Sequence, residues 1–468
     1  MAAIDPSSAA FLLAENRSMP MHVGALQLYE KPEGAGPDFV RGMVEQMRDV
    51  PEIAPLFRKH PFRSPRTGGA LVWRDDTQFD IEHHMRHAAL PAPGRIRELL
   101  ELCGRLHQTR LDWSRPLWEA TIIEGLEDGR VAMYAKMHHG LVDGISAMRL
   151  LQKTLSTDPD QRDMPAPWSA EFARSRRGGK AVEAPDRGLS ELPGEVVRSA
   201  LGITAEAAGM PSALVRTLTR GVRNQTSTLS LHAPRTMFNQ EITGARRFAA
   251  DDWPIERLKA IGKATGTSLN DVVLAMCAGA IREYLIEHDA LPEEPLIAMV
   301  PIGLKARDVG SASAEGGNAV GSVMARLATN VADPGERLAA IHASMADGKQ
   351  ALASMTPAQI IAMSAIGQVP AVLPPLLKMQ GIVKAPYNLI ISNVPGPQQP
   401  HYWNGAKLVG NYPASIPING MALNITCTSY DGMLCFGLTG CRRTVPQLQR
   451  LLTHLEDAVV GLEEAAGV

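Results

Sequence analysis

Residues 131–148 constrain the fold of this chain more than any other segment. Up to Met137 the residues alternate with the period of two expected of a β-strand, with Val131, Met133, Ala135 and Met137 on one face and Ala132, Tyr134 and Lys136 on the other. An apolar helical pattern begins after Asp143-Gly144. The pair His138-His139 therefore stands where a strand ends, and Asp143 stands where a helix begins. Polar side chains at such a junction can face a cleft instead of the core.

Three interpretations of these polar residues compete. In the first, the histidines are structural residues with hydrogen-bonded rings, and Asp143 is the N-cap of the following helix. In the second, they bind a metal, but zinc normally takes three or four protein ligands. The sequence has no Cys-x-x-Cys pair, and His83, His84 and His87 could contribute only through long-range folding. In the third, they form a catalytic His–Asp pair. Spacing alone does not choose among the three.

The bulk properties of the chain describe a globular protein with more than one domain. A length of 468 residues suits two domains of roughly 200 residues each, and 45% hydrophobic with 21% charged residues excludes a disordered chain. A net charge of −2 gives no reason to expect a nucleic-acid partner. The five cysteines are odd in number and lack paired spacing, which is typical of reduced thiols in the cytosol. No secretion signal is visible at the N-terminus.

Pattern changes along the chain divide it into three parts. Residues 1–154 mix strand and helix patterns, including a strand from His22 to Leu28, a short strand from Phe79 to Ile81 and a helix from Glu98 to Leu106. Residues 155–235 are rich in Pro, Gly and charge and predict a linker that ends in an amphipathic helical segment. Residues 236–468 again mix helices and strands. An Asp431-Gly432 turn there predicts a hairpin.

Residues 350–377 carry no charged side chain and are long enough to span a bilayer. Four prolines and several polar residues interrupt this segment, so we expect a buried helix pair instead of a transmembrane helix. An acyl-binding groove or a lipid-contacting surface is the functional alternative.

Residues 138–144, with the sequence His-His-Gly-Leu-Val-Asp-Gly, resemble the HHxxxDG motif of bacterial wax ester synthase/acyl-CoA:diacylglycerol acyltransferases. Peptide-bond-forming condensation domains carry a similar motif. Four further blocks resemble the acyltransferase family in the same order along the chain: Pro20-Met-His-Val-Gly24, Arg115-Pro-Leu-Trp118, Asn270-Asp271 and Asn393-Val-Pro-Gly-Pro397. The resemblance extends from about Asp5 to the last helix.

The resemblance implies an α/β (α+β) fold of two chloramphenicol acetyltransferase-like domains. Each would be a mixed sheet with flanking helices, and an active-site tunnel would lie at the domain interface. It also implies transfer of a long-chain acyl group from acyl-CoA to diacylglycerol, to a long-chain alcohol, or to both. Acyl-CoA would be a co-substrate, and we expect neither a cofactor nor a metal. Such a protein would be cytoplasmic and associate peripherally with the inner face of the membrane or with lipid droplets.

Acyl transfer to an alcohol needs a base with a pKa near the working pH, and histidine is such a base. The resemblance assigns this role to His139 and a supporting role to His138. The apolar run of residues 268–284 predicts a buried helix capped by Ser268, with Asn270 in its first turn. Asn270 is a candidate donor to the oxyanion, although it could instead have a capping role. The resemblance also implies a structural role for Asp143, with an arginine partner for which Arg307 is one candidate. Gly144 and Gly140 would allow a tight loop, with Gly140 and Asn393 beside the substrate.

Two other functions remain open from the sequence. A condensation-type acyltransferase of natural-product or complex-lipid assembly would share the fold and the base but use a carrier-protein donor. This chain contains no adjacent carrier or adenylation domain, which disfavours that reading. A non-catalytic lipid-binding homologue would keep the fold without the activity.

Overall fold

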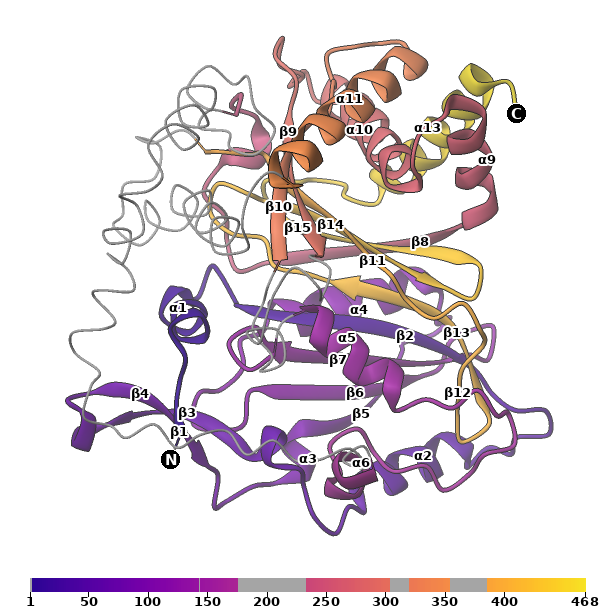
Figure 1. Ribbon diagram of the computed structural model, residues 1–468. Coiled ribbons are helices and arrows are strands. Elements are labelled where there is room, and N and C mark those ends of the chain that lie inside the picture. The colour runs from indigo at the N-terminus through magenta and orange to yellow at the C-terminus, as the bar shows by residue number, and fades with distance from the viewer. Residues whose placement is uncertain (1, 143, 176–232, 304–319, 354–384) are drawn as a thin grey trace.

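The computed structural model describes residues 2–142, 144–175, 233–303, 320–353 and 385–468. The described residues form two six-stranded mixed sheets that lie one above the other, with a small three-stranded sheet at one side (Figure 1). This arrangement confirms the predicted α/β fold class with two domains. Much of the predicted linker and most of residues 350–377 lie outside the described residues, and the predicted domain boundaries remain a proposal.

The first sheet has the strand order β12-β13-β2-β7-β6-β5. Its centre is the antiparallel pair of β2 and β7, in which Tyr29 lies opposite Val131 and His22 lies opposite His138. This pair confirms the strands predicted from His22 to Leu28 and along residues 131–137. The bounds are β2 His22–Glu30, β5 Met85–Ala89, β6 Trp118–Glu124, β7 Val131–His138, β12 Tyr402–Trp403 and β13 Ala406–Ala414.

The second sheet has the strand order β10-β9-β11-β14-β15-β8, and β11 runs parallel to both of its neighbours. Strands β14 and β15 form the hairpin predicted at Asp431-Gly432. Both turn residues have positive φ, 44° and 78°, as a tight hairpin turn requires. The bounds are β8 Arg246–Pro254, β9 Ile297–Gly303, β10 Val320–Arg326, β11 Leu389–Val394, β14 Leu423–Tyr430 and β15 Met433–Cys441.

Helices cover the outer face of the second sheet and both sides of the first (Figure 1). Helix α10 is apolar around most of its surface because it packs between α9, α11 and α13. The bounds are α1 Pro6–Ala14, α2 Phe39–Arg48, α3 Ile81–His84, α4 Ile96–Gln108, α5 Gly144–Lys153, α6 Ala170–Ser175, α9 Ile255–Thr265, α10 Leu269–Glu287, α11 Pro334–Ala353 and α13 Arg450–Ala466. The small sheet contains β1 Ala2–Ala3, β3 Lys59–Ser64 and β4 Ala70–Asp75.

One predicted strand is wrong. Phe79 and Asp80 pair with no strand among those described, and Ile81 is the first residue of the short helix α3. The carboxylate of Asp80 accepts a hydrogen bond from the Glu82 N–H at 3.0 Å, so this residue acts as a helix N-cap. The alternation that suggested a strand is only three residues long, and a local cap overrides it.

Strand β13 comes from the C-terminal half of the chain but pairs with β2 in the first sheet, from Lys407 opposite Glu30 to Ala414 opposite Gly24. It also packs against the second sheet, because the Tyr412 hydroxyl donates to Asp252 Oδ1 at 2.9 Å. A Cβ on Gly437 of β15 would lie 1.8 Å from the Pro413 carbonyl oxygen, so only glycine allows this approach. The crossing strand therefore joins the two sheets.

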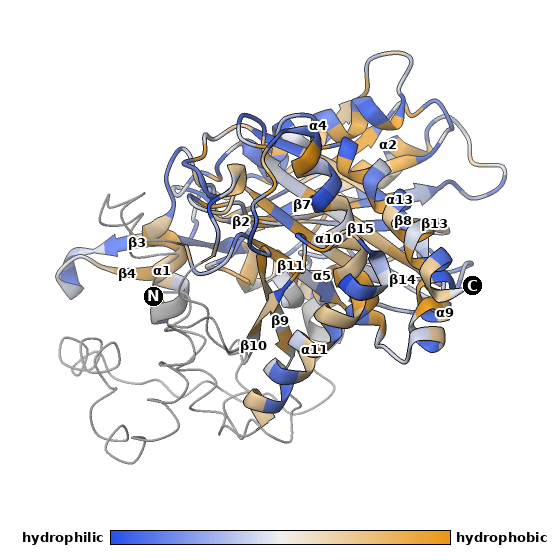
Figure 2. Cartoon of the chain, turned by 90° about the horizontal axis from the view of Figure 1, so that it is seen from above, coloured by the Kyte–Doolittle hydropathy of each residue, from blue (hydrophilic) through white to orange (hydrophobic). Residues whose placement is uncertain are grey.

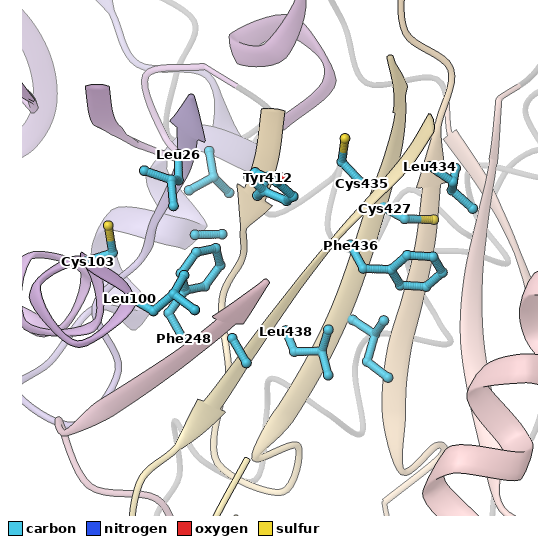
Figure 3. Close-up of a cluster of buried hydrophobic side chains, with 14 of the residues drawn as sticks. Leu26, Leu100, Cys103, Phe248, Tyr412, Cys427, Leu434, Cys435, Phe436 and Leu438 are labelled. Atoms are coloured by element: carbon cyan, nitrogen blue, oxygen red, sulfur yellow. The ribbon is translucent and has the colours of Figure 1, made fainter. Parts of the chain in front are cut away.

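The hydrophobic core is continuous across this junction. Figure 3 shows Leu26 of β2 and Leu100 of α4 beside Phe248 of the second sheet, whereas Phe436 of β15 points to the other face of that sheet; all four belong to one buried cluster. The five cysteines are all buried and free, and Figure 3 labels three of them within this cluster. Figure 2 shows apolar residues along the central strands and hydrophilic residues on the outer loops and helices.

None of the described helices is by itself long and apolar enough to cross a membrane. Helices α9 and α10 reach the required length and composition only as a pair, and they are bent by 103° relative to each other.

Candidate functional site

The histidine doublet is fixed by backbone hydrogen bonds at the end of β7. The His138 N–H donates to the Leu117 carbonyl at 3.0 Å, just before β6. The His139 N–H donates to the Met21 carbonyl at 2.8 Å, just before β2. Because the two bonds reach opposite neighbours, the strand end is held on both sides and the direction of each ring is set by the sheet.

His138 is completely buried and points into the protein. Its Nδ1 accepts a hydrogen bond from the Gly140 N–H at 2.9 Å, so the proton of the neutral ring is on Nε2. Burial lowers the pKa of His138 to about 3, and the nearby charges of His139 and Arg110 act in the same direction. His138 is therefore neutral near pH 7.

His139 is half-buried, and its ring stacks on the phenyl ring of Phe11. The ring centroids are 4.0 Å apart and the planes are inclined by 23°. Phe11 belongs to α1, which packs directly on the turn after β7. The stacking covers one face of the imidazole with an apolar surface and restricts its rotation, and Nδ1 of the ring is buried.

Gly140 allows α1 to pack directly against the turn after β7. A Cβ at this position would lie 2.8 Å from the Ser8 carbonyl oxygen and 3.2 Å from Leu12 Cγ, both in α1. Gly140 is buried. Its observed contacts are thus with α1 and His138, and its predicted contact with substrate stays a prediction.

A buried polar layer lies behind the doublet, formed by His22, His107, Tyr134, Lys136 and His138. Tyr134, Lys136 and His138 share one face of β7 because they are two residues apart. Gly24 of β2 leaves room for the tyrosine, since a Cβ there would lie 2.7 Å from the Tyr134 hydroxyl. The sequence does carry a signal for this layer, a lysine and a tyrosine in step with a histidine, but the alternation alone gave no reason to expect them to be buried.

Most polar groups of this layer have hydrogen-bond partners. Lys136 Nζ donates to the carbonyls of Leu106 and Thr109 at 2.8 and 2.6 Å and lies 3.2 Å from Glu119 Oε2. The Tyr134 hydroxyl donates to His107 Nδ1 at 2.6 Å, and His107 Nε2 donates to the Ser415 carbonyl at 2.9 Å.

The buried rings of the layer are neutral. Burial lowers the pKa of His107 to about 3 and that of His22 well below its usual range. The layer therefore supports the doublet without adding imidazolium charge.

Asn270 lies in the first turn of α10, as predicted, and is half-buried. The cap of this helix is formed by its neighbours, because Asp271 N–H donates to Ser268 Oγ and Ser268 N–H donates to Asp271 Oδ2 at 3.0 Å. Asp271 also accepts a hydrogen bond from His342 of α11 at 2.8 Å. The capping role that the sequence left open for Asn270 is thus filled by Ser268 and Asp271. Its oxyanion role stays a prediction.

Asn393 lies near the end of β11, where its register partner is Cys427 of β14. The turn that follows is held by the Gly396 N–H, which donates to Ser429 Oγ at 2.9 Å. A Cβ on Gly396 would be 2.1 Å from the Ser429 carbonyl oxygen and 3.3 Å from Gln152 Nε2 of α5. The helix that begins at Gly144 and the Asn393 block, far apart in the sequence, therefore lie side by side.

Asp143 and Arg307 lie outside the described residues, so their predicted pairing stays a prediction. Gly144 begins α5, and a Cβ there would be 3.9 Å from Val23 Cγ1 of β2. Trp118, the first residue of β6, packs between His84 and Trp168, with its Nε1 donating to the Phe57 carbonyl. Within the described part of the chain, no group of three or more His, Cys, Asp or Glu side chains is arranged to bind a metal.

Two family models match this chain. Residues 4–273 match the model described as wax ester synthase/diacylglycerol acyltransferase catalytic domain, and residues 316–463 match the C-terminal domain model of the same family. A Mycobacterium tuberculosis H37Rv protein named as a probable diacylglycerol O-acyltransferase is 45% identical over 99% of both chains. Another protein of this strain, whose name assigns the same activity provisionally, is 48% identical over 99% of this chain and 100% of its own.

Solved structures show the same similarity. The wax ester synthase/diacylglycerol acyltransferase from Marinobacter aquaeolei VT8 is 39% identical, with a TM-score of 0.78 over the full length of both chains. The starter condensation domain of rhizomide synthetase is 14% identical, with a TM-score of 0.56 over 100% of this chain and 94% of that one. The second match indicates a shared fold only.

Proposed function

Because this chain belongs to the wax ester synthase/diacylglycerol acyltransferase family, we propose that it transfers a fatty acyl group from acyl-CoA to the hydroxyl of diacylglycerol, of a long-chain alcohol, or of both. The observation that carries this proposal is the unequal burial of the doublet. His138 is enclosed and neutral, whereas His139 is only half-buried and stacks on Phe11.

His139 is the general base of the proposed reaction. Its neutral imidazole takes the proton of the acceptor hydroxyl as that oxygen attacks the thioester carbonyl, and a C–O bond forms. The tetrahedral intermediate then breaks its C–S bond, and the imidazolium returns the proton to the departing CoA thiolate. The amide of Asn270 would donate to the oxyanion, where one donor contributes about 3 kcal/mol to the lowering of the barrier.

No covalent acyl-enzyme is needed. Burial raises the pKa of the Cys103, Cys277, Cys427 and Cys435 thiols, so these cysteines are poor nucleophiles. Burial opposes ionisation of the Cys441 thiol, but hydrogen bonds with Thr444 and Thr243 lower its pKa to about 7. Its side chain is nevertheless enclosed, with no exposed surface for a substrate to reach. Direct transfer between the two substrates therefore fits the described cysteines better than a two-step route.

The condensation-type alternative is not favoured. Both family models belong to the acyltransferase family, whereas the condensation domain shares only the fold. The non-catalytic alternative is tested directly by His139→Ala, which should abolish thiol release from acyl-CoA. Equal slow thiol release by the wild type and the variant would favour a lipid-binding protein.

Product analysis decides the acceptor. The purified protein would be incubated with one radiolabelled acyl-CoA and, in parallel, with diacylglycerol, a long-chain alcohol or no acceptor, and the lipids separated by thin-layer chromatography. Labelled triacylglycerol, labelled wax ester or both are expected only when the matching acceptor is present. Absence of both esters would refute the proposal.

We also propose that the α1 side of the first domain binds a lipid surface. Helix α1 is apolar on nearly all sides, and Leu13 is 53% exposed. The β3–β4 hairpin lies beside α1 (Figure 1). Its exposed residues Arg63, Arg66 and Arg74 would attract anionic headgroups. Leu13→Asp should reduce co-sedimentation with phosphatidylglycerol vesicles. Val460→Asp, on the exposed side of α13, should leave it unchanged; equal effects would contradict this surface.

A further inference from the structure

Glu15 is a buried carboxylate that the proposed reaction does not use. It is the C-cap residue of α1, and its side chain has no exposed surface. Carboxylates are almost never fully buried unless they are paired with other groups. Its partners therefore indicate what it does.

Three donors from two segments hold the Glu15 carboxylate. Oε2 accepts from an Arg110 guanidinium nitrogen at 3.1 Å and from Trp113 Nε1 at 2.8 Å, both in the loop after α4. Oε1 accepts from the Met21 N–H at 3.2 Å, just before β2. The carboxylate thus joins the end of α1 to the start of β2.

Met21 transmits this attachment to His139. The same residue that donates its N–H to Glu15 accepts the His139 N–H on its carbonyl oxygen, at 2.8 Å. A shift of Met21 would move the acceptor that fixes the backbone of the catalytic histidine. Glu15 is therefore one residue removed from His139.

Glu15 also faces His138. The Nδ1 of His138 accepts from Gly140, so its Nε2 carries a proton, and this Nε2 lies 3.8 Å from Glu15 Oε1. Nε2 is buried and has no hydrogen-bond partner among the described residues. At this distance, with both side chains fully buried, the carboxylate attracts the N–H and favours the observed tautomer.

We infer that Glu15 is a positioning residue for the catalytic doublet: its carboxylate, fixed by Arg110 and Trp113, holds His139 through Met21 and holds the Nε2–H tautomer of His138. This inference rests on the proposed role of His139 as the base. Glu15 touches neither substrate nor the reacting atoms.

Charged and titratable groups from several elements surround the histidine doublet. Arg110 and Glu15 face His138 from the loop after α4 and from the end of α1, and Arg110 lowers the pKa of His138. His22 lies opposite on β2, and its own pKa is well below its usual range. Lys136 lies two residues earlier on β7 and pairs with Glu119 of β6. His107 of α4, whose pKa is about 3, completes the set.

Glu15→Gln would leave the Arg110 charge unbalanced beside the doublet. An unbalanced cation disfavours an imidazolium, so the acidic limb of the kcat/KM profile against pH should move to lower pH by at least about half a unit. Arg110→Gln should move the limb in the opposite direction. The double variant should return it to the wild-type position.

Measurements of kcat distinguish a loss of positioning from a change of charge. Glu15→Gln should lower kcat by about tenfold or more with little change in KM for acyl-CoA, because the contact to Met21 weakens. Glu15→Asp should keep the acidic limb of the wild type but lose rate, since its carboxylate is one methylene shorter. Glu45→Gln, an exposed residue of α2, is the matched control and should change neither quantity.

Failure of the proposed function and failure of the positioning role would give different experimental results. A wild-type protein without acyl-CoA-dependent ester formation refutes the proposed function before any variant is compared. An active wild type with Glu15→Gln unchanged in rate and profile refutes only the positioning role. Shifts of Glu15→Gln and Arg110→Gln in the same direction also refute it. If Glu15→Gln does not fold, Glu15→Asp and Arg110→Gln still carry the test.

Discussion

The phenyl ring of Phe11 and the imidazole of His139 are stacked, with centroids 4.0 Å apart, although 128 positions separate them in the sequence. The contact joins the first helix of the chain to the turn after β7. It makes α1 part of the wall around the candidate base, together with Gly140 and the Glu15 carboxylate.

Phe11→Ala should remove this support. The loss of a half-buried phenyl ring should lower the free energy of unfolding by about 2 kcal/mol, and kcat should fall by about tenfold as the imidazole gains freedom. Phe11→Leu should recover most of the stability but less of the rate. Urea denaturation and steady-state kinetics would check both, and full recovery of the rate by Leu would contradict a role for stacking.

Gly140→Ala should destabilise the protein because its new Cβ would lie 2.8 Å from the Ser8 carbonyl oxygen. Overpacking of this kind costs about 1–3 kcal/mol, and the displaced α1 should also reduce activity. Gly42→Ala in α2 is the matched control, since nothing lies within 4 Å of its Cβ. That change should stabilise the helix by about 0.5–1 kcal/mol. Thermal unfolding should show a lower melting temperature for Gly140→Ala and a higher one for Gly42→Ala. Shifts of both melting temperatures in the same direction would contradict the packing described.

Asn270→Ala and Ser268→Ala should separate catalysis from capping. Ser268 forms the cap, so its loss should cost about 1 kcal/mol of stability with little change in kcat. Asn270→Ala should leave the melting temperature nearly unchanged and lower kcat about 100-fold if its amide binds the oxyanion. A large decrease in melting temperature for Asn270→Ala with an unchanged kcat would indicate that this residue is structural.

Stability should fall as the pH falls below about 6.5. Burial lowers the pKa of His84 to about 4 and those of His107 and His138 to about 3, and His22 is also lowered. Between pH 6.5 and these values the unfolded chain binds more protons than the folded one, so each histidine removes about 1.4 kcal/mol per pH unit. Urea denaturation at several pH values measures the slope.

His84→Asn tests the source of that slope. Asparagine can still donate to the Trp118 carbonyl, as His84 Nδ1 does at 2.7 Å, but it cannot take up a proton. The variant should be less stable at pH 7 and show a shallower dependence on pH below 6.5. An unchanged slope would mean that His84 is already protonated in the folded protein.

Much of the fold follows from short-range pattern. The alternation along residues 131–137 predicted β7, the apolar run after Ser268 predicted α10, and the Asp431-Gly432 pair predicted the hairpin of β14 and β15. The Phe79–Ile81 prediction failed because three residues are too few to outweigh the cap at Asp80. No local pattern indicated that β13 would pair with β2, because the partner of a strand depends on packing and not on the strand's own pattern.

The candidate site was likewise only partly predictable from the sequence. The spacing of the doublet and its family resemblance identified His138 and His139 but not Glu15, since a single glutamate after a short helix looks like a solvated residue. Its burial depends on Arg110 and Trp113, about 95 positions away. No local pattern carries that information.

By itself the sequence determined the family, the class of fold and the two histidines, because these depend on motifs and periods that extend over a few residues. Only the tertiary structure decided which histidine is enclosed and which is half-buried, what supports them, and how the two sheets are joined. Those features arise from contacts such as His107 with Ser415, 308 positions apart, whose formation depends on the packing of the whole chain.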